Sequence, residues 1–290
     1  MSSRWGDPHT HITSSTLQPH LDSSHTRTNN LPTPLSKLIR IQLQSTIHNN
    51  MSSQTQQPKV LFVLTSHDKM GNTGKPTGWY LPEFAHPYDI LSPHAQITVA
   101  SVSGGAAPLD PASVEASKDD VSVNFLKNEE SLWKNTAPLS DFVGKASEFD
   151  AIFYAGGHGP MWDLAHNETS HKIISEFHAK DRIIAAVCHG PAALAYAKLP
   201  SGKYLLENAP VTGFSNTEEE AYVGLANMPF ELETALGEAS NGKFEKASDD
   251  WAAHITVANG GKIITGQNPA SASGVGEAIL AQLKKEGKTA

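Results

Sequence analysis

The sequence predicts an α/β fold, a three-layer sandwich built around a mostly parallel sheet. Short continuous apolar runs such as Ile183–Val187 are typical of strands buried on both faces, as parallel strands are. Segments with helical spacing of apolar residues lie between these runs, and the alternation continues over residues 58–288. Glycine, histidine and acidic residues gather where the runs end, which is where open α/β sheets place their chemistry.

The first elements of this pattern follow one another closely. The run Lys59–Thr65 predicts a buried strand, and a glycine-rich loop leads to an expected helix, Trp79–Leu91, with a distortion at Pro87. Gln96–Ser101 is the second expected strand. Residues 106–147 interrupt the alternation, and we expect an inserted helical region there, with helices over Val114–Lys118, Asn124–Trp133 and Leu139–Lys145.

The alternation then resumes. Phe149–Ala155 and Ile183–Val187 predict two strands, and His171–Ala179 between them predicts a helix with one apolar face. We expect a short strand at Ala209–Thr212. The helix expected next is Thr217–Tyr222, because Thr217 and Glu220 have the spacing of a capping box.

The last elements form a hairpin and a helix. Asn259-Gly260-Gly261 is a hairpin turn signal between two apolar runs, Ile255–Ala258 and Lys262–Thr265. Ala270–Lys285 predicts a final helix that becomes basic at its end, as the helix dipole favours.

Composition narrows the class of protein. The chain has 290 residues, a net charge of -8, 39% hydrophobic and 18% charged residues, which fits a folded core and disfavours a nucleic-acid surface. No apolar run approaches the roughly 20 residues of a membrane span. A single cysteine excludes an internal disulfide and suits a reducing compartment. We expect a cytoplasmic protein, with the nucleus as a further location.

Residues 1–57 differ from the α/β domain expected over 58–290. They are rich in Ser, Thr, Asn, Gln, His and Pro, and Asp7 and Asp22 are the only acids before Met51. We expect a disordered extension. The alternative is a basic helix over Leu35–His48, which would make residues 1–50 a mitochondrial address of the transit-peptide type.

The strongest chemical signal is the stretch Arg182–Ala193, Arg-Ile-Ile-Ala-Ala-Val-Cys-His-Gly-Pro-Ala-Ala. An apolar strand ends at Cys188, and an alanine-rich helical segment follows a sharp turn, which is the context of a nucleophile elbow. The N-terminus of that helix would favour the thiolate over the thiol. We interpret Cys188 as a candidate nucleophile, and the alternative is an inert cysteine in the core.

Two nearby side chains are candidates for acid–base work. His189 follows the cysteine at once, although adjacent residues at a turn can point apart, so it is either a base or a turn histidine with no chemical role. Glu83 lies among Leu, Pro, Phe and Ala, where partial burial would raise its pKa and let it hold or accept a proton beside the sulfur. The alternative for Glu83 is a solvated helix acid.

Two further clusters follow strand ends. The turn Gly156-Gly157-His158-Gly159 lacks bulk, so its N–H groups could stabilise an oxyanion, whereas the Lys and Ser/Thr of a phosphate loop are missing. We expect Gly157, His158 and Gly190 on this oxyanion or substrate-binding side. One of Glu218, Glu219 and Glu220 could orient His189 as the third member of a triad.

The remaining histidines do not form a metal-binding pattern. His86 and His94 have no second ligand at a familiar spacing, and neither HExxH nor CxxC occurs. The sequence therefore predicts no metal site.

These motifs together resemble the ThiJ/PfpI superfamily, which has the class I glutamine amidotransferase-like, flavodoxin-like fold. Within it the chain is similar to the fungal heat-inducible, chaperone-like glyoxalase III proteins, which act without glutathione. The resemblance covers about residues 58–285, and residues 1–57 lie outside it. The matching stretches are Lys59–Ser66, Gly78–Pro87, Ala155–Gly159, Ala185–Pro191, Thr212–Glu219 and Thr265–Ser271.

The resemblance implies roles for individual residues. It places the nucleophile at Cys188, its neighbouring histidine at His189, the acid beside the nucleophile at Glu83 and the acid that orients the histidine at Glu219. Glu218 and Glu220 stay open as alternatives to Glu219. Gly157 and the His189 backbone would supply the oxyanion donors.

The activity implied is a lyase of the lactate dehydratase type, which converts methylglyoxal, a small 2-oxoaldehyde, to lactate with no cofactor and detoxifies reactive carbonyls. Relatives suggest a homodimer with no nucleic-acid or membrane partner. The alternatives are a stress-response holdase or a protein deglycase acting on unfolded or glycated proteins, and then a cysteine peptidase. A glutamine amidotransferase is less consistent, because the late His254 is followed by Ile255 and Thr256 rather than by Glu two residues on.

Overall fold

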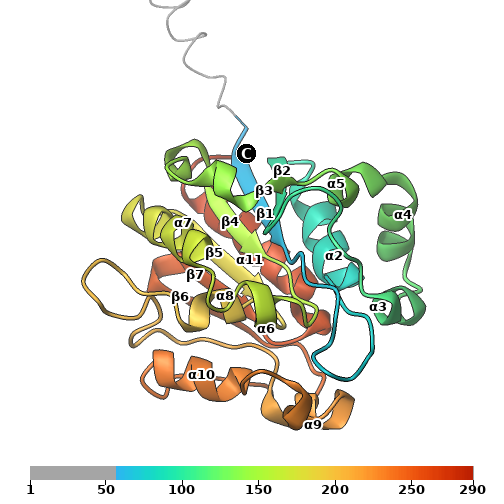
Figure 1. The fold of residues 1–290 in the computed structure, drawn as a ribbon. Helices are drawn as coiled ribbons and strands as arrows, with labels where there is room; N and C mark the ends of the chain where they lie inside the picture. Colours follow the sequence, from blue (N-terminus) through green and yellow to red (C-terminus); the bar gives the residue numbers. More distant parts are fainter. Residues whose placement is uncertain (1–56, 290) are drawn as a thin grey trace, which may run out of the picture. The chain divides into compact units, whose positions relative to one another are not determined.

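The computed structural model describes residues 57–289, which contain a seven-stranded sheet of order β3-β2-β1-β4-β5-β7-β6 (Figure 1). Neighbouring strands are parallel except for β6, which runs antiparallel to β7. The predicted α/β fold is confirmed. The strands are β1 (Lys59–Leu64), β2 (Gln96–Ser101), β3 (Ala137–Pro138), β4 (Ala151–Tyr154), β5 (Ile183–Val187), β6 (Ile255–Ala258) and β7 (Ile263–Gly266).

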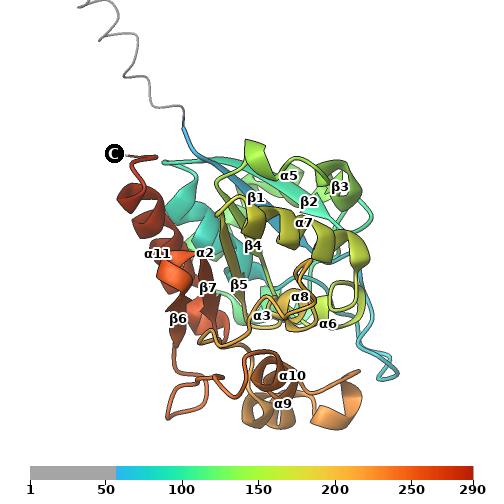
Figure 2. The same ribbon diagram turned by 90° about the vertical axis from the view of Figure 1, so that its left-hand side faces the viewer.

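Helices cover both faces of this sheet and give the three layers. In Figure 2, α2 and α11 lie side by side on one face, and α6, α7 and α8 lie on the other. The α-helices are α2 (Leu81–Leu91), α3 (Pro111–Ala116), α4 (Asp120–Asn128), α5 (Glu130–Lys134), α6 (Pro160–Asp163), α7 (Glu168–Ala179), α8 (Ala192–Ala195), α9 (Asn216–Tyr222), α10 (Leu232–Ala239) and α11 (Ala272–Lys285). The 3-10 turns are η1 (Leu139–Phe142), η2 (Ala146–Glu148), η3 (Leu225–Asn227), η4 (Asn259–Gly261) and η5 (Pro269–Ser271).

The central strands explain the apolar runs in the sequence. Every residue of β4 and β5 is buried, and so is every residue of β1 except Lys59. Full burial of a Val, Leu, Ile or Phe side chain stabilises the fold by about 1.5–3 kcal/mol, so each of these strands contributes strongly to the core. The hairpin predicted at Asn259-Gly260-Gly261 is present, because β6 and β7 pair around η4.

The strand predicted at Ala209–Thr212 is wrong. Val211 makes only an isolated bridge with Phe244, and this segment joins no strand of the sheet. The physical reason is that β5 and β7 already have neighbours on both sides, so the sheet offers no free edge there. The segment nevertheless lies close to the sheet, since the Thr212 N–H donates to Thr265 Oγ1 at 2.9 Å.

The region 106–147 holds helices in different places from those expected. Helix α3 begins at Pro111 because the Asp110 carboxylate caps it, with Oδ1 accepting the Ala112 N–H at 2.8 Å. Leu139–Lys145 is a 3-10 turn at its start rather than an α-helix. Ala137–Pro138 pairs with β2 as an edge strand of the sheet, and no apolar pattern in the sequence predicts this strand.

Helix α9 begins one residue earlier than predicted and has a different cap. The capping box joins Ser215 and Glu218, not Thr217 and Glu220. The Thr217 hydroxyl instead donates to Asp250 Oδ1 at 2.7 Å. Glu219 lies in the first turn of α9, and its side chain is buried.

The order of the strands determines where a ligand site can form. β1 lies between β2 and β4, so the chain leaves β1 to one side and later returns to its other side. Open α/β sheets bind ligands at the carboxyl ends of strands beside such a switch point. In residues 57–289 no helix is long and apolar enough to cross a membrane. The expectations for residues 1–56, a disordered extension or a targeting segment, lie outside the described residues.

Candidate active site

A pocket opens at the carboxyl ends of β1, β4 and β5 and contains the predicted nucleophile. It encloses about 280 Å³ between its lining atoms, part of it open to solvent. Segments far apart in the sequence supply its wall. The lining residues are Tyr80, Glu83, Gly157, His158, Cys188, His189, Phe214, Tyr222, Trp251 and Pro269.

Cys188 stands on a strained turn directly after β5. Its φ is +60°, a left-handed conformation that is costly for a side chain with a Cβ and is typical of a nucleophile elbow. Two hydrogen bonds hold it there: its N–H donates to the Gly266 carbonyl and its own carbonyl accepts the Phe214 N–H, both at 2.9 Å. Position 190 in the turn after Cys188 must be glycine, because a Cβ on Gly190 would lie 2.3 Å from the Tyr154 carbonyl oxygen.

His189 contacts the sulfur despite being its neighbour in the chain. Its Nδ1 lies 3.2 Å from Cys188 Sγ, and its Nε2 lies 2.6 Å from Glu219 Oε2. Of the three adjacent glutamates, Glu219 is thus the one that contacts His189. Glu218 serves the capping box of α9, and the exposed Glu220 accepts the Leu225 N–H at 3.0 Å.

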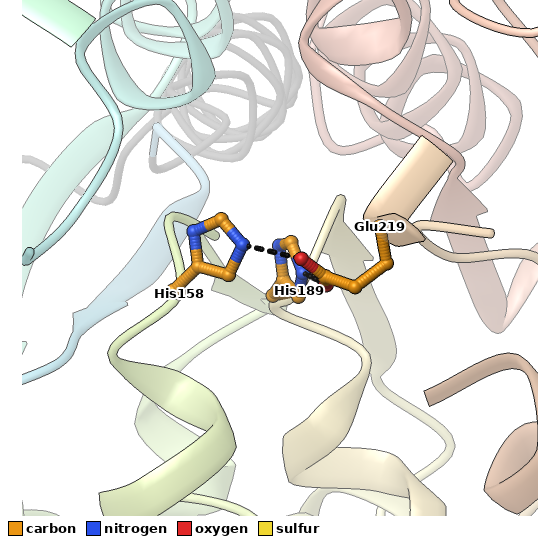
Figure 3. A group of neighbouring side chains, drawn as sticks. All are labelled: His158, His189 and Glu219. Carbon is orange, nitrogen blue, oxygen red and sulfur yellow. Dashed lines mark hydrogen bonds and ion pairs between the residues drawn. The ribbon is translucent and has the colours of Figure 1, made fainter. Parts of the chain in front are cut away.

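A second histidine shares this carboxylate. His158 Nε2 lies 2.9 Å from Glu219 Oε1, and Figure 3 shows both imidazole rings beside the Glu219 carboxylate. The two rings also lie against each other, with centroids 4.1 Å apart. Since each carboxylate oxygen accepts from one histidine, Glu219 fixes the orientation of both rings.

The protonation states of Glu219 and His189 follow from their burial and from their charged neighbours. Burial alone would raise the pKa of Glu219, but the two histidines outweigh it and hold that pKa well below the usual range. Burial, together with His158, lowers the pKa of His189, although Glu219 acts against this. His189 is therefore neutral at pH 7. Its Nε2–H donates to Glu219, and its Nδ1 lone pair faces the thiol.

Glu83 lies on the other side of the sulfur, near the start of α2. It is fully buried, and neither carboxyl oxygen has a hydrogen-bond partner among residues 57–289. Burial raises its pKa to about 8, and the Cys188 thiol and the nearby backbone N–H groups of Gly156 and Gly157 offset this only partly. Glycine is required beside it, because a Cβ on Gly156 would lie 2.3 Å from Glu83 Oε2. Glu83 is thus a neutral acid at pH 7, which can donate a proton into the pocket.

The expectation that a helix N-terminus favours the Cys188 thiolate is wrong. Helix α8 has only four residues, Ala192–Ala195, and burial together with the carboxylate of Glu83 raises the pKa of the Cys188 thiol well above its usual value. The resting form is the thiol, so its proton must leave as the sulfur reacts. The neutral His189 is placed to take it.

The residues expected on the oxyanion or substrate-binding side differ in their hydrogen bonds and in whether they line the pocket. The N–H groups of Gly157 and His189 donate to no carbonyl in the described part of the chain, and the Gly157 N–H lies near the Glu83 carboxyl. Gly190 is a correction, because its N–H donates to the Val187 carbonyl at 2.8 Å and it does not line the pocket. His158 does line the pocket, but its Nε2 is engaged by Glu219.

Sequence reasoning missed the aromatic part of the wall: Tyr80, Phe214, Tyr222 and Trp251. Tyr80 and Phe214 had a signal, because they belong to the matching stretches Gly78–Pro87 and Thr212–Glu219, whereas Tyr222 and Trp251 had none. Burial raises the pKa of Tyr80 above its usual range, with Tyr222 and Glu83 adding to the effect, so its hydroxyl remains a donor.

One group in the described residues has the donors that a transition metal ion would need. The ligand atoms of His158, His189 and Glu219 all lie within 4.8 Å of one another, and all three side chains are buried. Both histidine Nε2 atoms already donate to Glu219, so a metal ion would have to replace two hydrogen bonds. The sequence did not predict this group as a metal site.

Comparison with known proteins gives four informative similarities. The model of the DJ-1/PfpI family matches residues 81–282. The chain is 32% identical over 227 residues to the glutathione-independent glyoxalase hsp3102 of Schizosaccharomyces pombe. The aligned region covers 72% of this chain and 90% of that protein. It is 26% identical over 234 residues to the protein/nucleic acid deglycase HchA of Staphylococcus aureus, covering 77% and 76%. The solved structure of the 24 kDa Rapid Encystment Protein of Francisella tularensis is 40% identical, with a TM-score of 0.72 and coverage of 78% and 99%.

Proposed function

Because the chain belongs to the DJ-1/PfpI family, we propose that its pocket converts methylglyoxal and related 2-oxoaldehydes to 2-hydroxy acids without glutathione. The observation that supports the proposal is the pair of groups beside the Cys188 thiol, one a base and the other an acid. Cys188 has a neutral histidine nitrogen 3.2 Å from its sulfur and a buried, protonated glutamic acid on its other side. A thiol with a base and an acid at hand can add to an aldehyde and then move protons between adjacent carbons.

The first step forms a bond between Cys188 Sγ and the aldehyde carbon. His189 Nδ1 takes the thiol proton, and Glu83 gives its proton to the aldehyde oxygen, so the product is a neutral hemithioacetal. Glu219 steadies the imidazolium that forms. The N–H groups of Gly157 and His189, which donate to no carbonyl among residues 57–289, are suited to hold the oxygen while it carries charge.

The next steps shift a hydrogen from the first carbon to the second. The Glu83 carboxylate removes the proton on the first carbon, and the His189 imidazolium protonates the ketone oxygen, which gives an enediol. Glu83 then protonates the second carbon while His189 takes the hydroxyl proton on the first. The result is a thioester of the hydroxy acid on Cys188.

Water completes the cycle. It attacks the thioester carbon and gives a proton to Glu83, while the His189 imidazolium returns a proton to the departing sulfur. The enzyme is then back in its starting state, and the released acid ionises to lactate. All the protons are carried by Cys188, His189, Glu83 and the substrate, so the sequence of steps uses no thiol cofactor.

The experiment that tests this proposal is a stoichiometric assay without glutathione, followed over pH. We expect one lactate per methylglyoxal consumed. We also expect the rate to fall as pH rises through about 8, because ionised Glu83 can no longer donate a proton. Methylglyoxal loss without lactate, or lactate formation only with added glutathione, would overturn the proposal.

The Glu83→Gln variant serves as the control for the expected fall in rate at high pH. Glutamine keeps the size of the side chain but has no proton to lose, so its low residual rate should show no fall near pH 8. The Glu220→Gln variant removes a nearby exposed carboxylate and should keep the wild-type profile.

The similarity to HchA favours a second candidate, protein deglycation. A carbonyl adduct on an amine presents the same adjacent carbons to the thiol as free methylglyoxal does. The lactate assay distinguishes the two functions if it is run beside a glycated peptide. A deglycase would restore the free amine faster than the adduct's own dissociation allows, and a glyoxalase would act only on the free aldehyde.

A further inference from the structure

His158 is a buried histidine beside the nucleophile to which the proposed reaction gives no role. It is 4% exposed and lines the pocket, whereas the proton steps use only Cys188, His189 and Glu83. Burying a polar ring is costly unless its nitrogen atoms find hydrogen-bond partners. The partners of the His158 ring therefore indicate what this residue does.

The turn that carries His158 holds its backbone in one place. Glycines flank it on both sides, and neither has room for a side chain. A Cβ on Gly157 would lie 2.2 Å from the Gly78 carbonyl oxygen, and a Cβ on Gly159 would lie 2.4 Å from the Thr65 side chain. Because the neighbouring backbone is packed so closely, the position from which the His158 side chain leaves the turn is fixed.

Two residues of α9 hold the His158 ring. His158 Nε2 lies 2.9 Å from Glu219 Oε1, and the Tyr222 ring stacks on the imidazole with an interplanar angle of 2° and centroids 5.7 Å apart. Residues three apart in sequence lie on one face of a helix, so a single face of α9 supplies both contacts. The nitrogen atom and the face of the ring are thus both held by the helix that carries Glu219.

The Glu219 side chain is held from both sides in turn. Its second oxygen, Oε2, lies 2.6 Å from His189 Nε2, and both rings lie beside the carboxylate in Figure 3. Burial raises the pKa of Glu219, but the two histidines outweigh it and hold that pKa well below the usual range. A hydrogen bond donated to a carboxylate favours its ionised form, so the His158 N–H helps to keep Glu219 charged.

The charge on Glu219 matters while His189 carries two protons. When His189 takes the thiol proton at Nδ1, its Nε2 proton still faces Glu219 across 2.6 Å. If Glu219 accepted that proton, His189 would become neutral and keep its other proton at Nδ1. A neutral imidazole is a far weaker acid than an imidazolium, so His189 would return a proton to the ketone oxygen or to the sulfur only slowly. The His158 N–H opposes this transfer because it stabilises the carboxylate.

We propose that His158 is a positioning residue for the reaction: its Nε2–H holds Glu219 as a carboxylate that orients His189 without taking its proton. This inference rests on the proposed function, because the proton steps are those of the Cys188 reaction. In this role His158 acts through Glu219 and transfers no proton to the substrate.

Two substitutions separate the N–H of His158 from its ring. His158→Phe keeps a planar ring against Tyr222 but has no N–H, whereas His158→Gln loses the ring and keeps an N–H donor. Hydrogen bonds to charged groups change an equilibrium about ten- to a hundredfold, so we expect kcat for methylglyoxal to fall about tenfold or more in His158→Phe. His158→Gln should stay within about threefold of the wild type, because the donor to Glu219 is kept. An equal loss in both variants would overturn the proposal, since the imidazole itself would then be required.

A double-mutant cycle identifies the residue through which His158 acts. In the Glu219→Gln background the carboxylate is absent, so adding His158→Phe should cause no further loss of kcat. Residues that act through each other give non-additive effects, whereas independent residues give effects that multiply in rate. A double variant whose loss is the product of the two single losses would overturn the proposal.

Three controls accompany these measurements. His158→Leu also lacks an N–H donor and should show the same loss as His158→Phe. His178→Phe makes the matching change at an exposed residue of α7 outside the pocket and should behave as the wild type. The chain has one cysteine, so alkylation counts the intact sites in each variant. The assays contain a metal chelator, so that an ion held by the histidines cannot account for a difference.

The outcomes separate this inference from the proposed function. A folded His158→Phe protein that forms lactate at the wild-type rate would refute the role of His158 and leave the glyoxalase reaction in place. No lactate formation by the wild-type protein without glutathione would refute the proposed function itself.

Discussion

Replacing Cys188 by alanine is expected to abolish lactate formation from methylglyoxal in the absence of glutathione. The sulfur forms the covalent bond in every step, and removal of a nucleophile from a catalytic group typically costs about 10⁶-fold in kcat. The chain has one cysteine, so no other thiol can substitute. The measurement is lactate released per enzyme over a long incubation. Retention of wild-type activity would contradict the account.

The same variant separates enzyme from holdase. Suppression of aggregation depends on apolar surface and not on the thiol, so a holdase function would survive in Cys188→Ala. Circular dichroism and thermal unfolding should match the wild type, because alanine keeps the Cβ and removes only one buried atom. A variant that lost both activities while folding normally would link the two functions to the sulfur.

Replacing Glu219 by glutamine should have the second largest effect. In glutamine an NH2 donor replaces one of the two carboxylate oxygens, so His158 Nε2 or His189 Nε2 loses its acceptor. The negative charge that stabilises the His189 imidazolium is lost in either orientation, so His189 becomes a weaker base. An equivalent change in a serine-protease triad costs about 10⁴ in kcat, and we expect about 10³–10⁴ here.

Two variants accompany that measurement. Glu220→Gln alters the adjacent, exposed glutamate and should stay near wild type. His158→Gln removes one of the two histidines on Glu219 and should cost less than Glu219→Gln, because His189 keeps its acceptor. A loss in Glu219→Gln no greater than that in Glu220→Gln would show that the carboxylate does not orient the base.

Much of the fold could be predicted because its signals are local. The predicted bounds of β2 and β5 match the structure to the residue. For β5 the reason is that a strand buried on both faces needs a continuous apolar sequence. Ala137–Pro138 could not be predicted, because two residues carry no pattern. The false strand at Ala209–Thr212 shows the converse, since a short apolar segment says nothing of whether the sheet has a free edge.

The candidate site also has a part that the sequence could predict and a part that it could not. Cys188, His189 and Glu83 stand in recognisable motifs, and the resemblance placed Glu219 correctly beside His189. The raised pKa of Glu83 was expected from its apolar neighbours. The protonation state of Cys188 could not be predicted, because burial by distant segments raises the pKa of its thiol. Trp251 was missed because its position depends on a contact with Glu218, 33 residues away in sequence.

The most direct test of the central claim is to look for the covalent intermediate on Cys188. The protein is mixed with one equivalent of methylglyoxal, quenched with acid within the first turnover, and analysed by intact mass and peptide mapping. We predict a single adduct, of the mass of one methylglyoxal, on the peptide that contains Cys188, decaying at the rate at which lactate appears. Lactate formation at full rate with no such adduct, or with an adduct that outlives it, would contradict the account.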